Sequence, residues 1–273
     1  MVGRLSDGHR VVANPLITCG HCANCLAGAQ NLCESWRLLG MDQTPGAFAE
    51  YVTLPAEQIY EIPEELPSAR AVLCEPLANI VHLFRIAAPA PFFRLAIVGG
   101  GTMGALALLV SQRVGARDVL VVDVSDQRLE TARRLGASVT ANTGSPEGLA
   151  EARHAAGRGY DLVLDANGSG PARQAAFDLC RPGGCVVLLG MSAQRSEFDF
   201  VTSIRKEHRV VMSFAYTPVD FLRALDLLIA GEVDLERWTE HLPLERGQEA
   251  LERLAHRPGT TLKMLLEVAS RRS

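Results

Sequence analysis

A chain of 273 residues, 48% of them hydrophobic, is long enough for about two domains with cores of their own. Its net charge of −4 and its scattered Lys and Arg residues argue against a nucleic-acid-binding surface. The first residues lack the apolar core of a signal peptide, and the uncharged stretch 95–112 carries four glycines near its start, so we expect a cytoplasmic protein without a membrane span.

The first part of the chain reads as loops and short strands broken by Gly and Pro, and it contains a crowded cysteine cluster. Four of the seven cysteines fall within fifteen residues: Cys19, Cys22, Cys25 and Cys33. A tetrahedral Zn²⁺ site accepts four thiolates, and the two-residue gaps let one loop wrap the ion. The spacing therefore predicts a closed structural zinc site that holds a loop in shape and performs no chemistry.

Clustered cysteines have three other uses in proteins. An iron–sulfur cluster also takes four thiolates, but the usual bacterial run closes with a three-residue gap, and the last gap here is seven. Disulfides require an oxidising compartment, and we find no signal that would direct the chain to one. A redox C-x-x-C pair explains two cysteines and leaves two. Zinc is the interpretation that uses all four cysteines and fits their spacing.

After a helical run at 76–87 and a Pro-rich hinge at 88–93, the pattern becomes a regular alternation of strands and helices. We expect apolar strands at 95–100, 119–124, 160–167 and 185–190, and amphipathic helices at 125–137 and 170–184. A further helix at 219–234 and a strand at 261–268 follow. Short, continuously apolar strands between helices indicate an α/β fold with a parallel sheet covered on both faces.

A glycine pattern stands between the first of these strands and the helix after it: Gly99, Gly101 and Gly104, in the spacing G-x-G-x-x-G. The next strand carries Asp123 near its end. The glycines would allow a tight turn, close approach of a pyrophosphate and helix–strand packing, while the acid would bind the ribose hydroxyls. Since a carboxylate repels a 2′-phosphate, this arrangement predicts NAD rather than NADP.

Two alternatives to NAD binding stay open for the glycine pattern. It could be a plain tight turn, with Asp123 serving as a helix N-cap. A methyltransferase-like sheet that binds adenosylmethionine also uses a glycine turn and an acid. The strand before, the helix after and the acid on the next strand together favour a dinucleotide.

The cysteine cluster ahead of a dinucleotide fold resembles the zinc-containing medium-chain dehydrogenases, which include alcohol, polyol and threonine dehydrogenases. The resemblance covers essentially the whole chain, from GHRVVANPLITCGHCANCLAG through PGAFAEYVTLP and CEPLANIVHLF to IRKEHRVVMSFAYTPVDFLRALDLL. It implies a Rossmann domain and a truncated, β-rich GroES-like catalytic domain. The implied divisions are 1–88 (partial catalytic domain), 89–216 (NAD-binding domain) and 217–273 (return to the catalytic domain).

The resemblance also assigns roles to single residues. It places Arg128 against the adenosine ribose, Lys263 at the pyrophosphate and Glu75 near the position of the catalytic zinc. By the rule that ligands bind at the carboxyl ends of parallel strands, the loops near Asn167 and Gly190 border the nicotinamide end.

One departure bears on the substrate. The polyol branch of the family usually has Arg before the Tyr of its substrate wall, whereas this chain has Ala215 before Tyr216.

The ligands of the family's catalytic zinc are missing from these 273 residues. Neither the C-G-x-D stretch nor the Gly-His-Glu motif occurs, so we expect an N-terminally truncated form with no catalytic zinc and doubtful activity. Cys74 beside Glu75 is expected to be a buried core cysteine, and His82 is expected to be structural.

The sequence therefore predicts an NAD-dependent zinc alcohol dehydrogenase that oxidises a polyol or secondary alcohol to a ketone and forms a homodimer or homotetramer. One alternative is a non-catalytic, NAD-binding remnant that dimerises through the strand at 209–214. Another is a zinc-free reductase of the quinone-reductase kind, which the cysteine cluster and Asp123 both disfavour, because such enzymes usually lack the cluster and prefer NADP.

Overall fold

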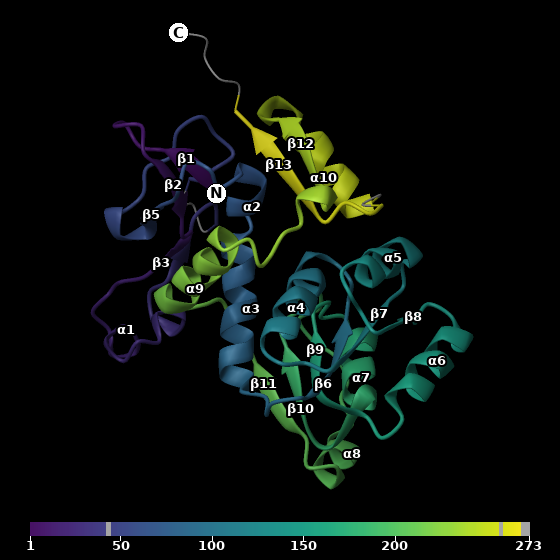
Figure 1. Cartoon of the computed structure of the whole chain (residues 1–273). Helices are drawn as coiled ribbons and strands as arrows, with labels where there is room; N and C mark the ends of the chain where they lie inside the picture. Colours follow the sequence, from purple (N-terminus) through teal and green to yellow (C-terminus); the bar gives the residue numbers. More distant parts are fainter. Residues whose placement is uncertain (42–44, 257–258, 269–273) are drawn as a thin grey trace. The chain divides into compact units, whose positions relative to one another are not determined.

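A computed structural model describes the chain except residues 42–44, 257–258 and 269–273. It divides into two compact units (Figure 1). One, here the cysteine unit, comprises Met1–Asn79 and Ala215–Ser273; the other, here the sheet unit, comprises Ile80–Phe214. The division falls within helix α3 (Cys74–Ala87). The sequence-based domain limits after residues 88 and 216 stay predictions.

The sheet unit is built on six parallel strands in the order β11-β10-β9-β6-β7-β8. Their bounds are β6 Arg94–Val98, β7 Asp118–Asp123, β8 Val139–Asn142, β9 Tyr160–Asp165, β10 Cys180–Leu188 and β11 Arg209–Met212. The central strands are apolar on both faces: Leu95, Ala96 and Ile97 of β6 are all completely buried. This confirms the expected α/β class with a parallel sheet covered on both sides.

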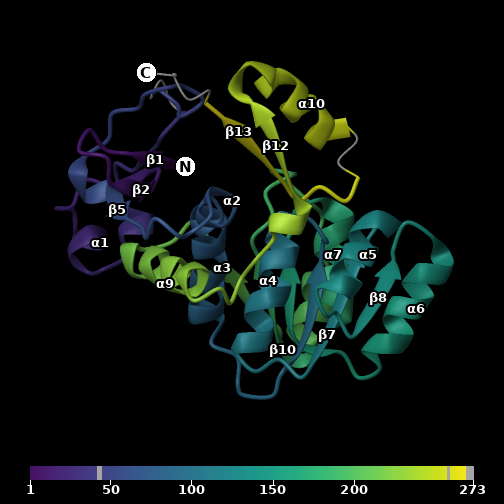
Figure 2. The ribbon, with the colours of Figure 1, turned by 45° about the horizontal axis from the view of Figure 1, so that its top comes forward.

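Helices connect the strands and cover the two faces (Figures 1 and 2). They are α4 Thr102–Arg113, α5 Asp126–Arg134, α6 Pro146–Ala156, α7 Gly170–Leu179 and the short α8 Phe200–Arg205. Right-handed connections place α4 and α5 on one face and α6 and α7 on the other, where α6 and α7 contact each other. Ser125, Ser145 and Ser169 begin α5, α6 and α7 by accepting main-chain N–H bonds of the first turn.

The cysteine unit consists of small sheets and helices. Its strands are β1 Val2–Arg4, β2 Arg10–Ala13 and β5 Ile59–Glu61 in one antiparallel sheet, the pair β3 Leu16–Ile17 and β4 Arg37–Leu38, and the parallel pair β12 Thr239–Pro243 and β13 Lys263–Glu267. Its α-helices are α1 Ala23–Leu26, α2 Ser68–Ala71, α9 Pro218–Ile229 and α10 Gly247–His256. The 3₁₀ turns among its described residues are η1 Gln30–Leu32, η2 Ala56–Gln58, η3 Glu236–Trp238 and η4 Leu244–Arg246.

Three sequence-based expectations need correction. The helix expected over 170–184 ends at Leu179, because β10 begins at Cys180, opposite Tyr160, and contains Pro182, which cannot continue a helix. The helix expected over 219–234 ends at Ile229, shortly before Gly231 adopts a left-handed φ of 71°. Strand β8 was missed, because four residues with two polar side chains give little apolar signal.

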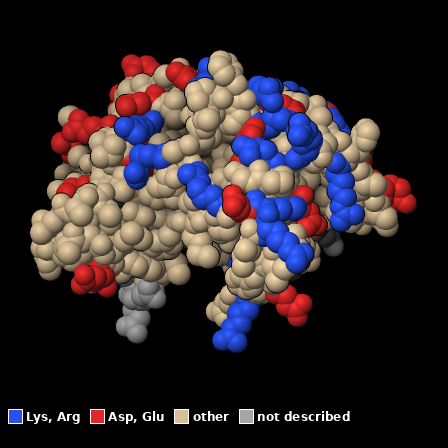
Figure 3. Space-filling view, turned by 90° about the horizontal axis from the view of Figure 1, so that it is seen from below, with Lys and Arg blue, Asp and Glu red and all other residues tan. Residues whose placement is uncertain are grey.

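Two further observations concern the charges on the surface and the lengths of the helices. On the face drawn in Figure 3, Lys and Arg side chains are interspersed with Asp and Glu side chains. Among the described residues, no helix is both long enough and apolar enough to cross a bilayer.

Candidate functional site

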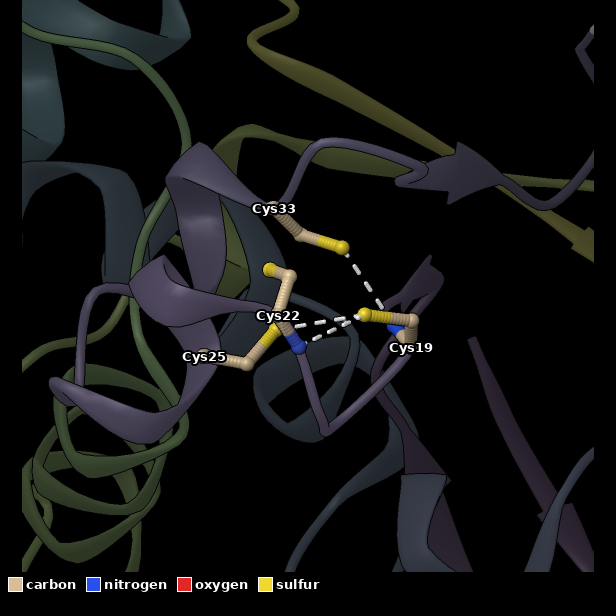
Figure 4. Close-up of side chains that lie close together, drawn as sticks. All are labelled: Cys19, Cys22, Cys25 and Cys33. Atoms are coloured by element: carbon tan, nitrogen blue, oxygen red, sulfur yellow. Dashed lines mark hydrogen bonds between the residues drawn. The ribbon is translucent and has the colours of Figure 1, made fainter.

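The four cysteines of the cluster converge in one loop (Figure 4). Their Sγ atoms all lie within 4.8 Å of one another, and those of Cys19 and Cys25 are 3.9 Å apart. A zinc–sulfur bond of about 2.3 Å implies sulfur–sulfur distances of about 3.8 Å in a tetrahedron. The quartet therefore needs only small adjustments to hold one Zn²⁺ ion.

The local backbone explains why the sulfurs meet. Gly20, with φ of 76°, turns the chain after Cys19, and Cys22 then caps the short helix α1 that carries Cys25. The 3₁₀ turn η1 brings back Cys33, which follows its last residue. A side-chain bond from Asn24 Nδ2 to the carbonyl of Leu32 (2.7 Å) ties the two arms together.

Main-chain N–H groups point at the sulfurs. Cys33 Sγ accepts from the N–H of Cys19 (3.3 Å) and from that of Ser35 (3.4 Å), while Cys19 Sγ accepts from the N–H of Cys22 (3.3 Å). Bonds from the main chain of His21 and Cys22 lower the pKa of Cys19 to about 6, and the bond from Cys19 lowers that of Cys33. Burial raises the pKa of Cys25 to about 12. Donors aimed at thiolates are what a metal–thiolate site requires.

The alternatives for these cysteines can be compared with this geometry. No disulfide joins any of the seven cysteines, all of which lie in the described part of the chain. Within the described part of the chain, the quartet is also the one group of three or more Cys, His, Asp or Glu side chains placed to share a metal ion. The donor set and the spacing fit Zn²⁺, which stays the favoured occupant.

The glycine turn in the sheet unit has the form that the spacing predicted. Gly99 follows β6 with φ of 108°, and Gly101 caps the N-terminus of α4. A Cβ atom on Gly104 would lie 1.9 Å from the carbonyl oxygen of Gly99, whereas one on Gly101 would have no neighbour within 4 Å. The third glycine is therefore needed for helix–strand packing, and the second leaves its outer side open for a ligand.

Asp123 ends β7 beside this turn. Its Oδ2 accepts a bond from the main-chain N–H of Gly100 (2.7 Å), and its Oδ1 accepts one from Ser125 (2.9 Å). Arg128 Nη1 lies 3.7 Å from Oδ2. The N-cap of α5 is Ser125 and not Asp123, so the alternative role that the sequence left open for this acid is wrong.

A cavity of about 380 Å³ adjoins the turn and the acid. Its lining includes Gly99, Asp123, Arg128, Thr143 and Asn167. It begins at the carboxyl ends of β6 and β7, where nucleotides bind in open α/β sheets, and runs between α6 and α7 as far as Arg153 and Asp178. The structure thus brings Asp123 and Arg128 together on one cavity next to the first glycine.

Glu75 and Lys263 both lie in the cysteine unit. Glu75, in the first turn of α3, accepts a bond from Asn79 Nδ2 (3.1 Å). Burial lowers the pKa of Lys263, and the negative charge of Glu75 opposes that change. Burial, followed by the charge of Glu75, raises the pKa of Tyr216, whose hydroxyl donates to Asn14 Oδ1 (3.1 Å). Cys74 is completely buried, as expected. The proposed roles of Glu75 and Lys263 stay predictions.

One pair of residues in the sheet unit was not found from the sequence. Asp165 ends β9 as Asp123 ends β7, and it is completely buried. Arg173 Nε lies 3.9 Å from its Oδ2. The available signal was an acid at the end of an apolar strand, in YDLVLD, but the sequence alone does not show which cation faces it.

Comparison with known proteins bears on both units. Residues 1–64 match the alcohol dehydrogenase GroES-like domain, and residues 102–230 match the zinc-binding dehydrogenase family. The chain is 35% identical over 206 residues to L-threonine 3-dehydrogenase of Deinococcus deserti, covering 73% of this chain and 58% of the relative. It is 31% identical over 271 residues to the D-xylulose reductase A assigned in Aspergillus terreus, covering 97% and 76%.

A solved structure gives the same result at the level of the fold. The Escherichia coli CFT073 alcohol dehydrogenase rspB, complexed with NADH, superposes with a TM-score of 0.86 at 27% identity. The match covers 95% of this chain and 77% of that one.

This chain belongs to the zinc-containing medium-chain dehydrogenase family. The expected pairing of a Rossmann sheet with a GroES-like domain is confirmed. The chain spans 58% of the length of the threonine dehydrogenase relative, so the activity of a whole family member comes to it as a proposal.

Proposed function

We propose that this protein serves NAD-dependent alcohol oxidation, in which a secondary alcohol or polyol becomes a ketone by hydride transfer to the nicotinamide. The observation that carries the proposal is the position of Asp123 between the glycine turn and the adjoining cavity. The threonine dehydrogenase and xylulose reductase relatives, whose names denote oxidation or reduction at a carbon–oxygen bond, support this reaction class.

The residues of the sheet unit fit a dinucleotide. NAD supplies the hydride acceptor when it is bound. The open side of Gly101 and the N-terminus of α4 would receive the pyrophosphate, and Asp123 would accept hydrogen bonds from the adenosine ribose hydroxyls. Arg128 would lie along the same ribose, whereas the proposed role of Lys263 at the pyrophosphate rests on the family resemblance alone. These residues bind and orient the cofactor.

The preference for NAD over NADP follows from the same carboxylate. The Asp123 side chain is only 4% exposed and is held by two main-chain N–H bonds, so it cannot swing away from a 2′-phosphate. Arg128, at 3.7 Å, is its one ion-pair partner among the described residues and compensates the repulsion only in part. We therefore propose NAD as the physiological cofactor.

The residues of this chain fit the structural zinc site of the family but not its catalytic zinc site. The cysteine quartet fits a structural Zn²⁺ ion, which would hold the loop 19–33 in shape. A catalytic zinc needs about three protein ligands and an open position. Of the described residues, only Glu75 matches a position near that metal.

A non-catalytic role as an NAD-binding, dimeric protein is the alternative, and one observation favours association. Strand β11 ends the sheet and pairs only with β10 among the described residues, while Met212 on it is 79% exposed. We propose that two copies associate through this edge. Sedimentation analysis of the wild type and of Val210→Lys tests it, since a charge on the edge should yield monomers.

The decisive experiment measures cofactor binding and turnover separately. Calorimetry with NAD⁺, NADP⁺ and adenosylmethionine should give tight binding of NAD⁺ alone. Spectrophotometric assay of NADH formation with a panel of secondary alcohols and polyols then reports catalysis. Adenosylmethionine binding, or no binding of any of the three, would overturn the proposal, whereas NAD⁺ binding without turnover under any condition would favour the non-catalytic alternative.

A further inference from the structure

We propose that the buried pair Asp165–Arg173 is a positioning device, which holds the loops after β9 and β10 in the shape that receives the nicotinamide half of the cofactor. The inference rests on the proposed binding of NAD and concerns the part of that site on the β9 and β10 side of the glycine turn. It concerns the sheet unit alone, and Asp165 and Arg173 are positioning residues that act through the two loops.

Asp165 fixes both loops at once. Its Oδ1 accepts bonds from the main-chain N–H groups of Asn167 (3.0 Å) and Gly168 (2.8 Å), which begin the loop after β9. Its carbonyl oxygen accepts bonds from Leu189 (3.1 Å) and Gly190 (2.9 Å), which begin the loop after β10. One buried residue therefore determines where two chain segments leave the sheet.

The two loops pack backbone against backbone. A Cβ atom on Gly168 would lie 2.2 Å from the carbonyl carbon of Gly190, and one on Gly190 would lie 2.2 Å from that of Asn167. The N–H of Ala193 donates to the carbonyl of Gly168 (3.1 Å), and the hydroxyl of Ser192 donates to that of Asn167. Such close contact leaves no room for independent movement of either loop.

Arg173, on α7, ties the second loop to the carboxylate. Its Nη2 donates to the carbonyl of Ala193 (2.7 Å) and its Nη1 to Ser196 Oγ (3.1 Å), while Nε faces Asp165 Oδ2 at 3.9 Å. That oxygen is buried and has no hydrogen-bond partner among the described residues. A buried carboxylate is costly without a cation nearby, so the Arg173 side chain, only 18% exposed, is held at this position.

The place of the pair in the sheet connects it to the cofactor. Strand β6, which carries the glycine turn, lies between β7 and β9, so Asp123 and Asp165 end the strands on either side of the turn. A Cβ atom on Gly99 would lie 3.4 Å from the carbonyl carbon of Ala166 and 3.5 Å from Asn167 Cβ, so the turn touches the loop directly. A dinucleotide with its adenosine at Asp123 and its pyrophosphate over the turn extends its other half toward the Asp165 side.

Substitutions in the Asp165–Arg173 pair should therefore weaken the binding of NADH more than that of ligands without the nicotinamide. We would measure by calorimetry the dissociation constants of AMP, ADP-ribose and NADH for the wild type and for Asp165→Asn, Arg173→Met and Arg173→Lys. Asp165→Asn keeps an oxygen for the two loop N–H groups and removes only the charge that faces Arg173. Asp161→Asn is the matched control: Asp161 lies at the start of the same strand and pairs with Arg181 Nε at 2.6 Å, away from the carboxyl edge.

We expect Asp165→Asn and Arg173→Met to weaken NADH about tenfold relative to ADP-ribose, the loss of roughly one well-placed interaction, with AMP unchanged. The enhancement of NADH fluorescence on binding should fall in parallel, and Arg173→Lys should recover part of both. Asp161→Asn should lower the melting temperature without changing the ratio of NADH to ADP-ribose affinity.

Two results would overturn the inference. One is equal weakening of the binding of all three ligands by the Asp165 and Arg173 variants, which would mark a general structural role. The other is an unchanged ratio of NADH to ADP-ribose affinity in variants that fold. If Asp165→Asn does not fold, the Arg173→Lys variant decides between these outcomes. Failure of the wild type to bind AMP, ADP-ribose or NADH would instead refute the proposed function, and the inference with it.

Discussion

The carboxylate of Asp123 accepts a hydrogen bond of 2.7 Å from the main-chain N–H of Gly100, so the acid at the end of β7 holds the glycine turn that follows β6. The same carboxylate is the group proposed to select NAD. An Ala substitution would remove the charge and the anchor of the turn together. An Asn substitution removes the charge and keeps an acceptor oxygen, so it separates the two roles.

Asp123→Asn is therefore expected to narrow the preference between the cofactors. The wild type should bind NAD⁺ more tightly than NADP⁺ by roughly two orders of magnitude, because a carboxylate facing a 2′-phosphate costs a few kcal/mol. In Asp123→Asn, NADP⁺ should gain affinity while NAD⁺ loses some. Calorimetry with both cofactors checks this.

The control is Asp126→Asn, because this nearby acid bonds Asn142 Nδ2 instead of the turn. It should leave the ratio of the two affinities unchanged. Equal binding of NAD⁺ and NADP⁺ by the wild type would remove Asp123 from the selective role.

Alanine substitutions at two glycines of the turn should affect different quantities: stability at Gly104 and NAD⁺ affinity at Gly101. In Gly104→Ala the new Cβ would lie 1.9 Å from the carbonyl oxygen of Gly99, so the backbone must shift. We expect the free energy of unfolding to fall by about 1–3 kcal/mol or more, as overpacking does. In Gly101→Ala the Cβ meets nothing within 4 Å and φ is −72°, so stability should change by less than about 1 kcal/mol.

NAD⁺ affinity should nevertheless fall at least about tenfold in Gly101→Ala, because the Cβ occupies the side of the turn that the pyrophosphate approaches. Urea denaturation and calorimetry on the same two variants give both quantities. Unchanged NAD⁺ affinity in a folded Gly101→Ala protein would place the pyrophosphate elsewhere.

Cys22→Ser should cost the protein its structural metal. Purified wild type should hold close to one Zn²⁺ per chain in a sulfur-only shell, and the variant should lose most of it and unfold at a lower temperature. NAD⁺ affinity should stay unchanged in the protein that remains folded, since the glycine turn belongs to the other unit. Elemental analysis and X-ray absorption measure the metal and its ligands.

Cys185→Ser is the matched control for metal content. This buried cysteine lies in β10, outside the quartet, and accepts a bond from Arg209 Nε (3.3 Å) that a serine hydroxyl can also accept. Its zinc content should equal that of the wild type. Nitrogen or oxygen ligands in the wild-type absorption spectrum, or two metal ions per chain, would contradict the all-thiolate site.

The sequence predicted the features whose geometry depends on a short stretch of chain, namely the cysteine loop and the glycine turn. Cys19 to Cys33 and Gly99 to Gly104 act within one loop or turn, so their spacing alone specified their geometry. The end of α7 was misplaced because the helical pattern was extended through Cys180 to Gly184, although Pro182 cannot continue a helix and Cys180 pairs with Tyr160 in the sheet.

The pair Asp165–Arg173 could not be predicted in the same way. Its meaning depends on Gly168 and Gly190, which are distant in sequence and meet only when β9 and β10 pair. Asp123 was found because the glycine turn beside it has a recognisable spacing. Asp165 has no such companion motif, although both acids end apolar strands and both bind main-chain N–H groups.

The last prediction concerns turnover: the 273-residue chain should produce little or no NADH from alcohols. A catalytic zinc needs about three protein ligands, and Glu75 is the one described residue proposed to lie near that metal. A single carboxylate cannot hold Zn²⁺ against water. Without the metal, the alcohol must lose a proton whose pKa is close to that of bulk water, and hydride transfer stalls.

A paired assay tests this expectation. NADH formation with a panel of polyols and secondary alcohols is compared between this chain and a longer form that carries C-G-x-D and Gly-His-Glu motifs ahead of Met1. The longer form should turn over and lose activity in Glu75→Ala, whereas the 273-residue chain should bind NAD⁺ with or without that substitution. Robust turnover by the 273-residue chain, sensitive to Glu75→Ala, would defeat the prediction and show that other residues of this chain complete the site.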